Sequence, residues 1–232
     1  MPRSGDSGEV VTIRHRLNGR RARLHAWFDM LVTDHGVVRL VHPNWGEVAP
    51  GVYRSSQPSP GQLRRAHAKG IRTVLNLRAE RDCGAFVLQE AACAELGMDL
   101  VNVQVRSRDV PSKALIGDLD RLFATLPRPL LMHCKSGADR TGIVGALYLI
   151  LHEGRPVEEA VRSQLSWRWG HVRHAKTGML DFFFESYLAA NRARPMPFRQ
   201  WVEEVYDPVA VKAAFKAKFK PWLGVDVTFW RE

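Results

Sequence analysis

A cysteine and an arginine stand six residues apart in the string 133–142, which reads HCKSGADRTG. The residues at 129–133 read PLLMH and favour a short buried strand, and the apolar residues 140–152 favour a helix. In open α/β sheets, ligands bind at the carboxyl ends of strands, beside the first turns of helices. We therefore expect the thiol of Cys134 and the guanidinium of Arg140 at a ligand-binding edge.

A loop between a strand and a helix directs several backbone N–H groups inward and can cradle a tetrahedral oxyanion. Arg140 can hold two phosphate oxygens as a fork, and Gly137 permits close approach of the backbone to the ligand. The positive field also stabilises a thiolate, so that Cys134 can attack phosphorus and form a phosphocysteine that water hydrolyses. An inert buried cysteine would be followed by apolar residues instead. The expected phosphate-binding residues are Lys135, Ser136, Gly137, Ala138, Asp139 and Arg140.

The string 133–142 resembles the active-site signature of the cysteine-dependent protein tyrosine phosphatase superfamily, His-Cys-x5-Arg-Thr/Ser-Gly. Two upstream segments, VYRSSQP at 52–58 and GIRTVLNLR at 70–78, resemble atypical dual-specificity phosphatases of bacteria, fungi and plants. The resemblance covers about residues 45–155. It implies the fold of those enzymes and a phosphocysteine mechanism without a metal or other cofactor.

The same resemblance assigns roles to residues beside the loop. It implies that Thr141 donates a hydroxyl hydrogen bond to the departing sulfur, and that His133 orients the loop without reacting. Arg78 ends a predicted strand at the functional edge, where it can contact substrate. Arg54 and Gln57 can either line the site or stabilise a turn.

Cleavage of a phosphate ester also needs an acid that protonates the leaving oxygen. The resemblance implies an aspartate on a loop before the cysteine, and Asp109, 25 residues ahead of Cys134, is the first candidate. The string Trp-Pro-Asp is absent, and Asp109 can instead pair with Arg106 or Arg108. Asp139 is the second candidate, because Asp-Arg-Thr here resembles myotubularin-like lipid phosphatases and bacterial phosphatases of mixed specificity. Its alternative role is to clamp an arginine or a backbone amide.

Strands and helices alternate along the chain with short turns. This pattern predicts an α/β fold with a central, mostly parallel sheet flanked by helices, like that of dual-specificity phosphatases. Ser59 and Ser112 are expected to cap helices, and Gly97 to end one. Further strands are expected at 52–53, 71–77 and 100–105, and helices at 20–34, 60–70, 84–96, 112–126, 157–166, 179–190, 198–205 and 209–220.

The two ends of the chain differ from its middle. We expect a basic N-terminal arm with a helix (1–44), the phosphatase domain (45–190) and a C-terminal helical extension (191–232). A basic amphipathic helix in the extension can lie on an anionic membrane or pack on the catalytic domain with its lysines in solvent. The arm admits the same two interpretations. The residues of the amphipathic pattern are Val211, Phe215 and Phe219, with Lys212, Lys216 and Lys220 beside them.

Lys and Arg number 34 against 24 Asp and Glu, so the net charge is +10, and most of the cations are arginine. This favours an anionic partner: a phosphorylated substrate, a membrane surface or nucleic acid. The case for nucleic acid rests only on charge and on residues 166–176, where Arg168 or His171 can contact substrate or lie in an interhelical turn. Three cysteines without metal-ligand spacing argue against a disulfide scaffold or a zinc site and for a reducing, cytoplasmic compartment. Any membrane contact is expected to be peripheral, at the inner face.

These patterns together predict a metal-independent phosphatase that acts through a phosphocysteine intermediate. Phosphotyrosine and phosphoserine in proteins are the first substrate class. The alternatives are phosphoinositides or other phospholipid head groups, and inositol polyphosphates. A non-enzymatic alternative is a phosphate-binding pseudophosphatase with a blocked pocket.

Overall fold

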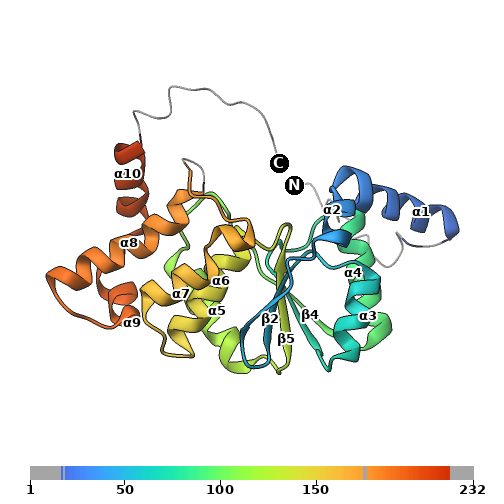
Figure 1. Cartoon of the computed structure of the whole chain (residues 1–232), viewed down its shortest axis with the longest axis horizontal. Coiled ribbons are helices and arrows are strands. Elements are labelled where there is room, and N and C mark those ends of the chain that lie inside the picture. The colour runs from blue at the N-terminus through green and yellow to red at the C-terminus, as the bar shows by residue number, and fades with distance from the viewer. Residues whose placement is uncertain (1–16, 18, 175–176, 220–232) are drawn as a thin grey trace, which may run out of the picture.

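The computed structural model describes residues 17, 19–174 and 177–219. A five-stranded sheet runs through the molecule in the order β1-β2-β5-β3-β4 (Figure 1). β1 is antiparallel to its neighbour, and the other four strands are parallel to one another, which confirms the mostly parallel sheet. The strands are β1 (Gly46–Ala49), β2 (Val52–Ser56), β3 (Thr73–Asn76), β4 (Asp99–Asn102) and β5 (Leu130–Cys134).

Helices cover both faces of the sheet, with α1 to α4 on one side and α5 to α10 on the other (Figure 1). Short π-helical stretches, Asp29–Thr33 and Trp201–Val205, continue α1 and α9. The helices are α1 (Arg20–Phe28), α2 (Gly36–Val41), α3 (Pro60–Ala68), α4 (Gly84–Leu96), α5 (Lys113–Thr125), α6 (Asp139–Leu151), α7 (Val157–Gln164), α8 (Gly178–Ala193), α9 (Phe198–Gln200) and α10 (Pro208–Phe219).

The central strand β5 is buried along its whole length. Leu130 and Met132 pack into the larger core, which includes residues of α5 to α9, whereas Leu131 packs into the core with residues of α3 and α4. A strand that is covered on both faces carries apolar side chains at successive positions instead of alternating with polar ones. This explains why the segment that leads into Cys134 is almost wholly apolar.

Local capping signals set several helix ends where the sequence predicts them. Ser59 and Gln62 form a capping box at the start of α3, each side chain bonded to the other's backbone N–H. The hydroxyl of Ser112 accepts a hydrogen bond from the N–H of Leu115 at 3.1 Å and begins α5. Gly97, with a φ of 64°, ends α4.

The helix expected at 20–34 is present in the N-terminal arm as a continuous helical segment from Arg20 to Thr33. α1 ends at Phe28, a π-helical turn follows, and a separate helix begins at Gly36. In this segment Trp27 and Leu31 pack against a small core with residues of α4, whereas Leu24 and Phe28 are 69% and 62% exposed. The expected extension is helical as far as the structure describes it, and none of the described helices is long and apolar enough to cross a membrane.

Candidate active site

The carboxyl ends of three parallel strands meet at one edge of the sheet. Ser56 at the end of β2 lies opposite Cys134 at the end of β5, and Asn76 at the end of β3 lies opposite His133. The loop 135–138 then leads directly into α6. Cys134 therefore lies at the edge where open α/β sheets bind ligands.

Gly137 gives this loop its tight form. Its φ is +74°, and a Cβ at this position would lie 2.8 Å from the carbonyl of Ser55 and from the backbone nitrogen of Ser56. Both the left-handed backbone and the close approach select glycine. The N–H of Gly137 donates to the sulfur of Cys134 at 3.2 Å, so this amide points at the thiol. Cys134 itself is 1% exposed.

The backbone carbonyls of the loop accept hydrogen bonds from residues outside the loop. The carbonyl of Lys135 accepts from the N–H of Gln57 at 3.1 Å, and that of Ser136 accepts from the side-chain amide of Asn44 at 2.9 Å. The carbonyl of Gly137 accepts from the guanidinium of Arg54. Because three successive carbonyls are satisfied on the outer side, the loop can present its amides to an anion inside it. The donors come from the segment 44–57.

His133 is fully buried behind the loop, and burial lowers its pKa to about 3, so the imidazole is neutral. The amide of Gln89 donates to Nε2 at 2.7 Å, which leaves the proton on Nδ1, 3.4 Å from the carbonyl of Cys134. The carbonyl of Gln89 accepts from the amide of Gln57, whose own carbonyl accepts from Arg78 at 3.0 Å. Each side chain in this series of hydrogen bonds fixes the next one, so His133 is well placed to orient the loop.

Arg78 is the first donor in this series of hydrogen bonds, and residues of the N-terminal arm hold it in place. Its two terminal nitrogens donate to the carboxylate of Asp34 at 2.9 and 3.0 Å. Arg39 pairs with the same carboxylate at 2.8 Å, and Lys135 of the loop lies 3.5 Å from it. Burial by itself raises the pKa of Asp34, but the three cations, Arg78 first, lower it overall. An ionised aspartate therefore anchors Arg78 beside the loop.

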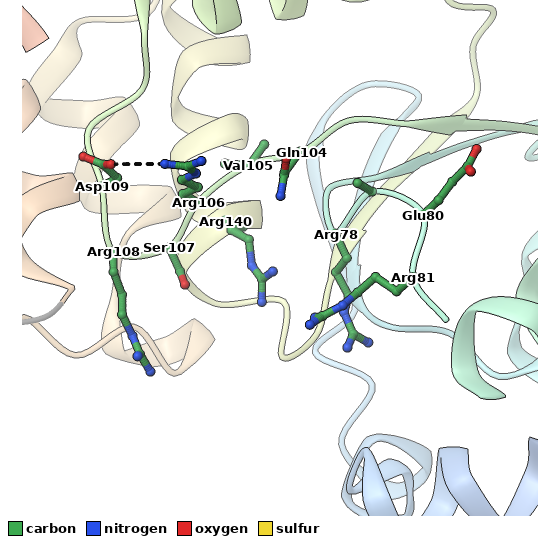
Figure 2. Close-up of a pocket in the computed structure, with 11 residues that line it drawn as sticks. Arg78, Glu80, Arg81, Gln104, Val105, Arg106, Ser107, Arg108, Asp109 and Arg140 are labelled. Atoms are coloured by element: carbon green, nitrogen blue, oxygen red, sulfur yellow. Dashed lines mark ion pairs between the residues drawn. The ribbon is translucent and has the colours of Figure 1, made fainter. Parts of the chain in front are cut away.

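A cleft of about 540 Å³ opens at the same edge, and five arginines line it (Figure 2). Within the described part of the chain, Arg81, Arg108 and Arg140 make no ion pair, so their charges are available to a ligand. A neighbouring opening of about 870 Å³ shares some of these arginines and is also lined by Lys135. Among the described residues that line either opening there is no Phe, Tyr or Trp. The five arginines are Arg78, Arg81, Arg106, Arg108 and Arg140.

Asp109 lies on the rim of this cleft. Figure 2 shows its carboxylate turned toward Arg106 and away from the guanidinium of Arg140. Lys212 of α10 lies 2.9 Å from Oδ2, and Arg106 lies 3.8 Å from the same oxygen. The expected alternative, an ion pair with Arg106, is thus present. The contact from the C-terminal extension is an addition that the sequence does not indicate.

Asp139, the other candidate acid, is held by a buried histidine. Its Oδ1 accepts from Nδ1 of His171 at 2.7 Å, and Nε2 of His171 donates to Asp181 at 3.0 Å. Burial lowers the pKa of His171, but the hydrogen bonds and charges of the two aspartates outweigh it and raise the pKa to about 9. The imidazolium therefore ties the start of α6 to α8. Asp139 acts here as a clamp, although on a histidine instead of the expected arginine or amide.

Thr141 is fully buried in the first turn of α6. Its hydroxyl has no hydrogen-bond partner among the described residues. A buried hydroxyl without a partner is costly, so a group that comes and goes during a reaction is a natural acceptor for it. The hydrogen bond from Thr141 to the sulfur, which the sequence resemblance implies, stays a prediction.

Several positioning residues lie outside the sequence motif. Asn44, Asp34 and Gln89 reach the loop or its supports from distant segments, and no local pattern indicates them. A polar side chain within an apolar helix, as at Gln89 in α4, was the available signal for one of them. In the described part of the chain, no three His, Cys, Asp or Glu side chains are grouped so that they could hold a metal ion.

Two solved structures are similar to this fold. TpbA from P. aeruginosa has a TM-score of 0.50 and 20% identity, over 74% of this chain and 90% of that one. A putative phosphatase from Shewanella putrefaciens CN-32 has a TM-score of 0.50 and 15% identity, over 66% of this chain and 95% of that one. At these identities the likeness shows the fold alone.

A family model described as a DSP-PTPase phosphatase fused to NAD+ kinase matches residues 43–177. The match spans more than half of the chain, and the chain belongs to this family. The protein is therefore a phosphatase of a DSP-PTPase family, which confirms the resemblance found in the sequence. No curated protein matches the chain at a significant level.

Proposed function

We propose that this protein hydrolyses phosphate monoesters through a phosphocysteine formed on Cys134. The observation that carries the proposal is the loop geometry: the N–H of Gly137 is aimed at the sulfur while the neighbouring carbonyls are bound from outside. An oxyanion in the loop would meet inward amides and the fork of Arg140. The thiolate attacks phosphorus and the leaving oxygen departs. Water then attacks the phosphocysteine and releases inorganic phosphate and the thiolate.

We assign protonation of the leaving oxygen to Asp109 rather than Asp139. Asp109 lies on the rim of the arginine-lined cleft, where its loop could bring it over a bound ester. Asp139 is already committed to His171 behind the loop. For Asp109 to act, its carboxylate must leave Lys212 and turn toward Arg140, a side-chain movement on a rim that solvent reaches.

Phosphotyrosine and phosphoserine in proteins are the first substrate class, since the cleft is open to solvent and would admit a phosphorylated side chain. A second candidate is a small substrate with several phosphates, such as an inositol polyphosphate or a phosphoinositide head group. Arg81 and Arg108, which have no ion pair among the described residues, favour it because one phosphate needs only the loop and Arg140. The lining also lacks an aromatic side chain that would stack on a tyrosine ring.

A turnover screen with phosphopeptides, phosphoinositides and inositol polyphosphates in EDTA tests the proposal, with Cys134→Ser measured beside the wild type. Turnover by the wild type and none by the variant would support it. Activity in the variant, or phosphate binding without any turnover by the wild type, would contradict it. Arg81→Met and Arg108→Met separate the two substrate classes, because they should weaken hydrolysis of polyphosphorylated substrates far more than that of p-nitrophenyl phosphate.

The choice of acid is tested by the pH dependence of turnover in Asp109→Asn and Asp139→Asn. The variant that removes the acid loses the basic limb of the profile and suffers most with poor leaving groups. We expect this of Asp109→Asn. The same result in Asp139→Asn alone would reverse the assignment.

A further inference from the structure

Arg54 lies behind the phosphate loop and is one of the largest fully buried side chains of the protein. It belongs to β2, where it stands opposite Met132 of β5, two residues before Cys134. It does not line the arginine-rich cleft. Arg54 extends from β2 to the outer side of the loop 135–138. This position distinguishes it from the arginines that face solvent.

The guanidinium of Arg54 is fixed on three sides. One terminal nitrogen donates to the carbonyl of Gly137, and the other donates to the carbonyl and the side-chain oxygen of Gln164 at 3.1 and 2.6 Å. Trp169 covers its face, with 4.3 Å from Cζ to the ring centroid. The ring is held in turn, since its Nε1 donates to the carbonyl of Ser163 at 2.8 Å. A planar fork that stacks and bonds in this way is specific to arginine.

In the part of the chain that the structure describes, the charge of Arg54 is not balanced by a carboxylate. Among the described residues, no Asp or Glu forms an ion pair with it, and all of its hydrogen-bond acceptors are neutral amide oxygens. Burial lowers its pKa to about 10, while the negative charge of Cys134 raises it, so the group is still a cation at neutral pH. A buried cation without an anion is destabilising. The groups close by that can supply the anion are the sulfur of Cys134 and a phosphate in the loop.

We propose that Arg54 is the buried counter-charge of the Cys134 thiolate and of the phosphate that replaces it during turnover. The inference rests on the proposed function only in that Cys134 is the nucleophile. The hydrogen bonds of Arg54 go to Gly137 of the loop and to Gln164, so it acts through the loop, as a positioning residue. By holding the carbonyl of Gly137 it fixes the backbone of the residue whose N–H donates to the sulfur, and by its charge it favours the ionised sulfur.

Alkylation of Cys134 by iodoacetamide tests this without any turnover. The rate is measured against pH in the full chain, and peptide mass spectrometry assigns the modification to Cys134 rather than Cys83 or Cys93. The variants are Arg54→Met, Arg54→Lys and, as a matched loss of one arginine charge at an exposed site on α3, Arg65→Met.

We expect Arg54→Met to move the midpoint of the alkylation profile upward by about one pH unit or more, and so to slow alkylation at pH 6 about tenfold. Arg54→Lys keeps the charge without the fork, so its midpoint stays near that of the wild type while kcat falls. Arg65→Met leaves both unchanged. Inorganic phosphate should also protect Cys134 at lower concentration in the wild type than in Arg54→Met.

An unchanged midpoint in folded Arg54→Met would overturn the inference. So would an equal shift in Arg54→Lys, because the effect would then be one of packing and not of charge. If Arg54→Met does not fold, Trp169→Leu removes the ring over the guanidinium and is expected to move the midpoint in the same direction by less; no movement refutes the inference. A wild-type Cys134 that alkylates like an ordinary thiol would count against the proposed function itself, whatever the variants do.

Discussion

Replacing His171 by asparagine removes a buried imidazolium that joins two carboxylates. In the wild type, its ring donates to Asp139 at the first turn of α6 and to Asp181 on α8, at 2.7 and 3.0 Å. The ring is 4% exposed, so both bonds lie largely out of water. We expect the variant to lose stability at neutral and acidic pH and to lose little at alkaline pH.

The magnitude follows from the pKa of His171, which is raised from 6.5 to about 9 in the folded protein. A group whose pKa rises on folding adds stability that is fully present below the unfolded pKa and is lost as the pH rises through the folded one. At about 1.4 kcal/mol per unit, the shift corresponds to about 3 kcal/mol between pH 6 and pH 9.5. The free energy of unfolding of the wild type should therefore fall over this window by up to that amount because of His171 alone.

Urea unfolding of the wild type and of His171→Asn, at pH values from 6 to 9.5, measures this directly. Subtracting the free energy of unfolding of the variant from that of the wild type removes the contributions of groups that titrate in both proteins. The remaining difference should shrink by about 3 kcal/mol from the acidic to the alkaline end. A difference that stays constant with pH would show that the ring does not carry a proton held by the two aspartates. A difference that grows with pH would show that the folded protein prefers the neutral ring.

Two further variants test the loop and the candidate acid. Gly137→Ala places a Cβ 2.8 Å from the Ser55 carbonyl at a φ of +74°, and should lose about 1–3 kcal/mol of stability and about a hundredfold or more of kcat, measured by denaturant unfolding and steady-state kinetics. Gly61→Ala, with nothing within 4 Å of its Cβ, is the control and should change neither; equal behaviour of the two would refute the argument from the loop. Lys212→Met frees Asp109 and should raise kcat/KM for poor leaving groups by about two- to fivefold, in line with the modest strength of an exposed ion pair, whereas Lys216→Met should not. A fall in kcat/KM would mean that Lys212 holds Asp109 in its working position.

The parts of the fold that the sequence predicts well are those with local causes. The capping pair Ser59 and Gln62, the cap at Ser112 and the terminal Gly97 each act within a few residues of the helix end that they set. The strand before Cys134 was recognisable because both of its faces are covered. The motif itself, a cysteine and an arginine on either side of one short loop, is visible without any distant residue.

The parts that the sequence does not predict depend on contacts between distant segments. Asn44 donates both to the loop and to the carbonyl of Trp169, 125 residues away, and the aspartate that holds Arg78 lies in the N-terminal arm. His171 lies in a turn whose mixture of aromatic and basic residues gave no reason to pair it with Asp139. Arg54 is a charged residue within a buried strand. Its presence indicates that hydrogen-bond acceptors must surround it, but the sequence does not identify them. Pairings of this kind arise from the tertiary fold, beyond the reach of periodicity and capping rules.

A chemical quench can show whether the phosphoryl group passes through the sulfur of Cys134. Asp109→Asn and the wild type are mixed with an activated phosphate ester, quenched in acid within the first turnover, digested and analysed by mass spectrometry. We expect the peptide containing Cys134 to carry one phosphoryl group in an amount close to that of the enzyme. Cys134→Ser should neither form a phosphocysteine nor release phosphate. Release of phosphate at a normal rate with this peptide never modified would contradict this expectation.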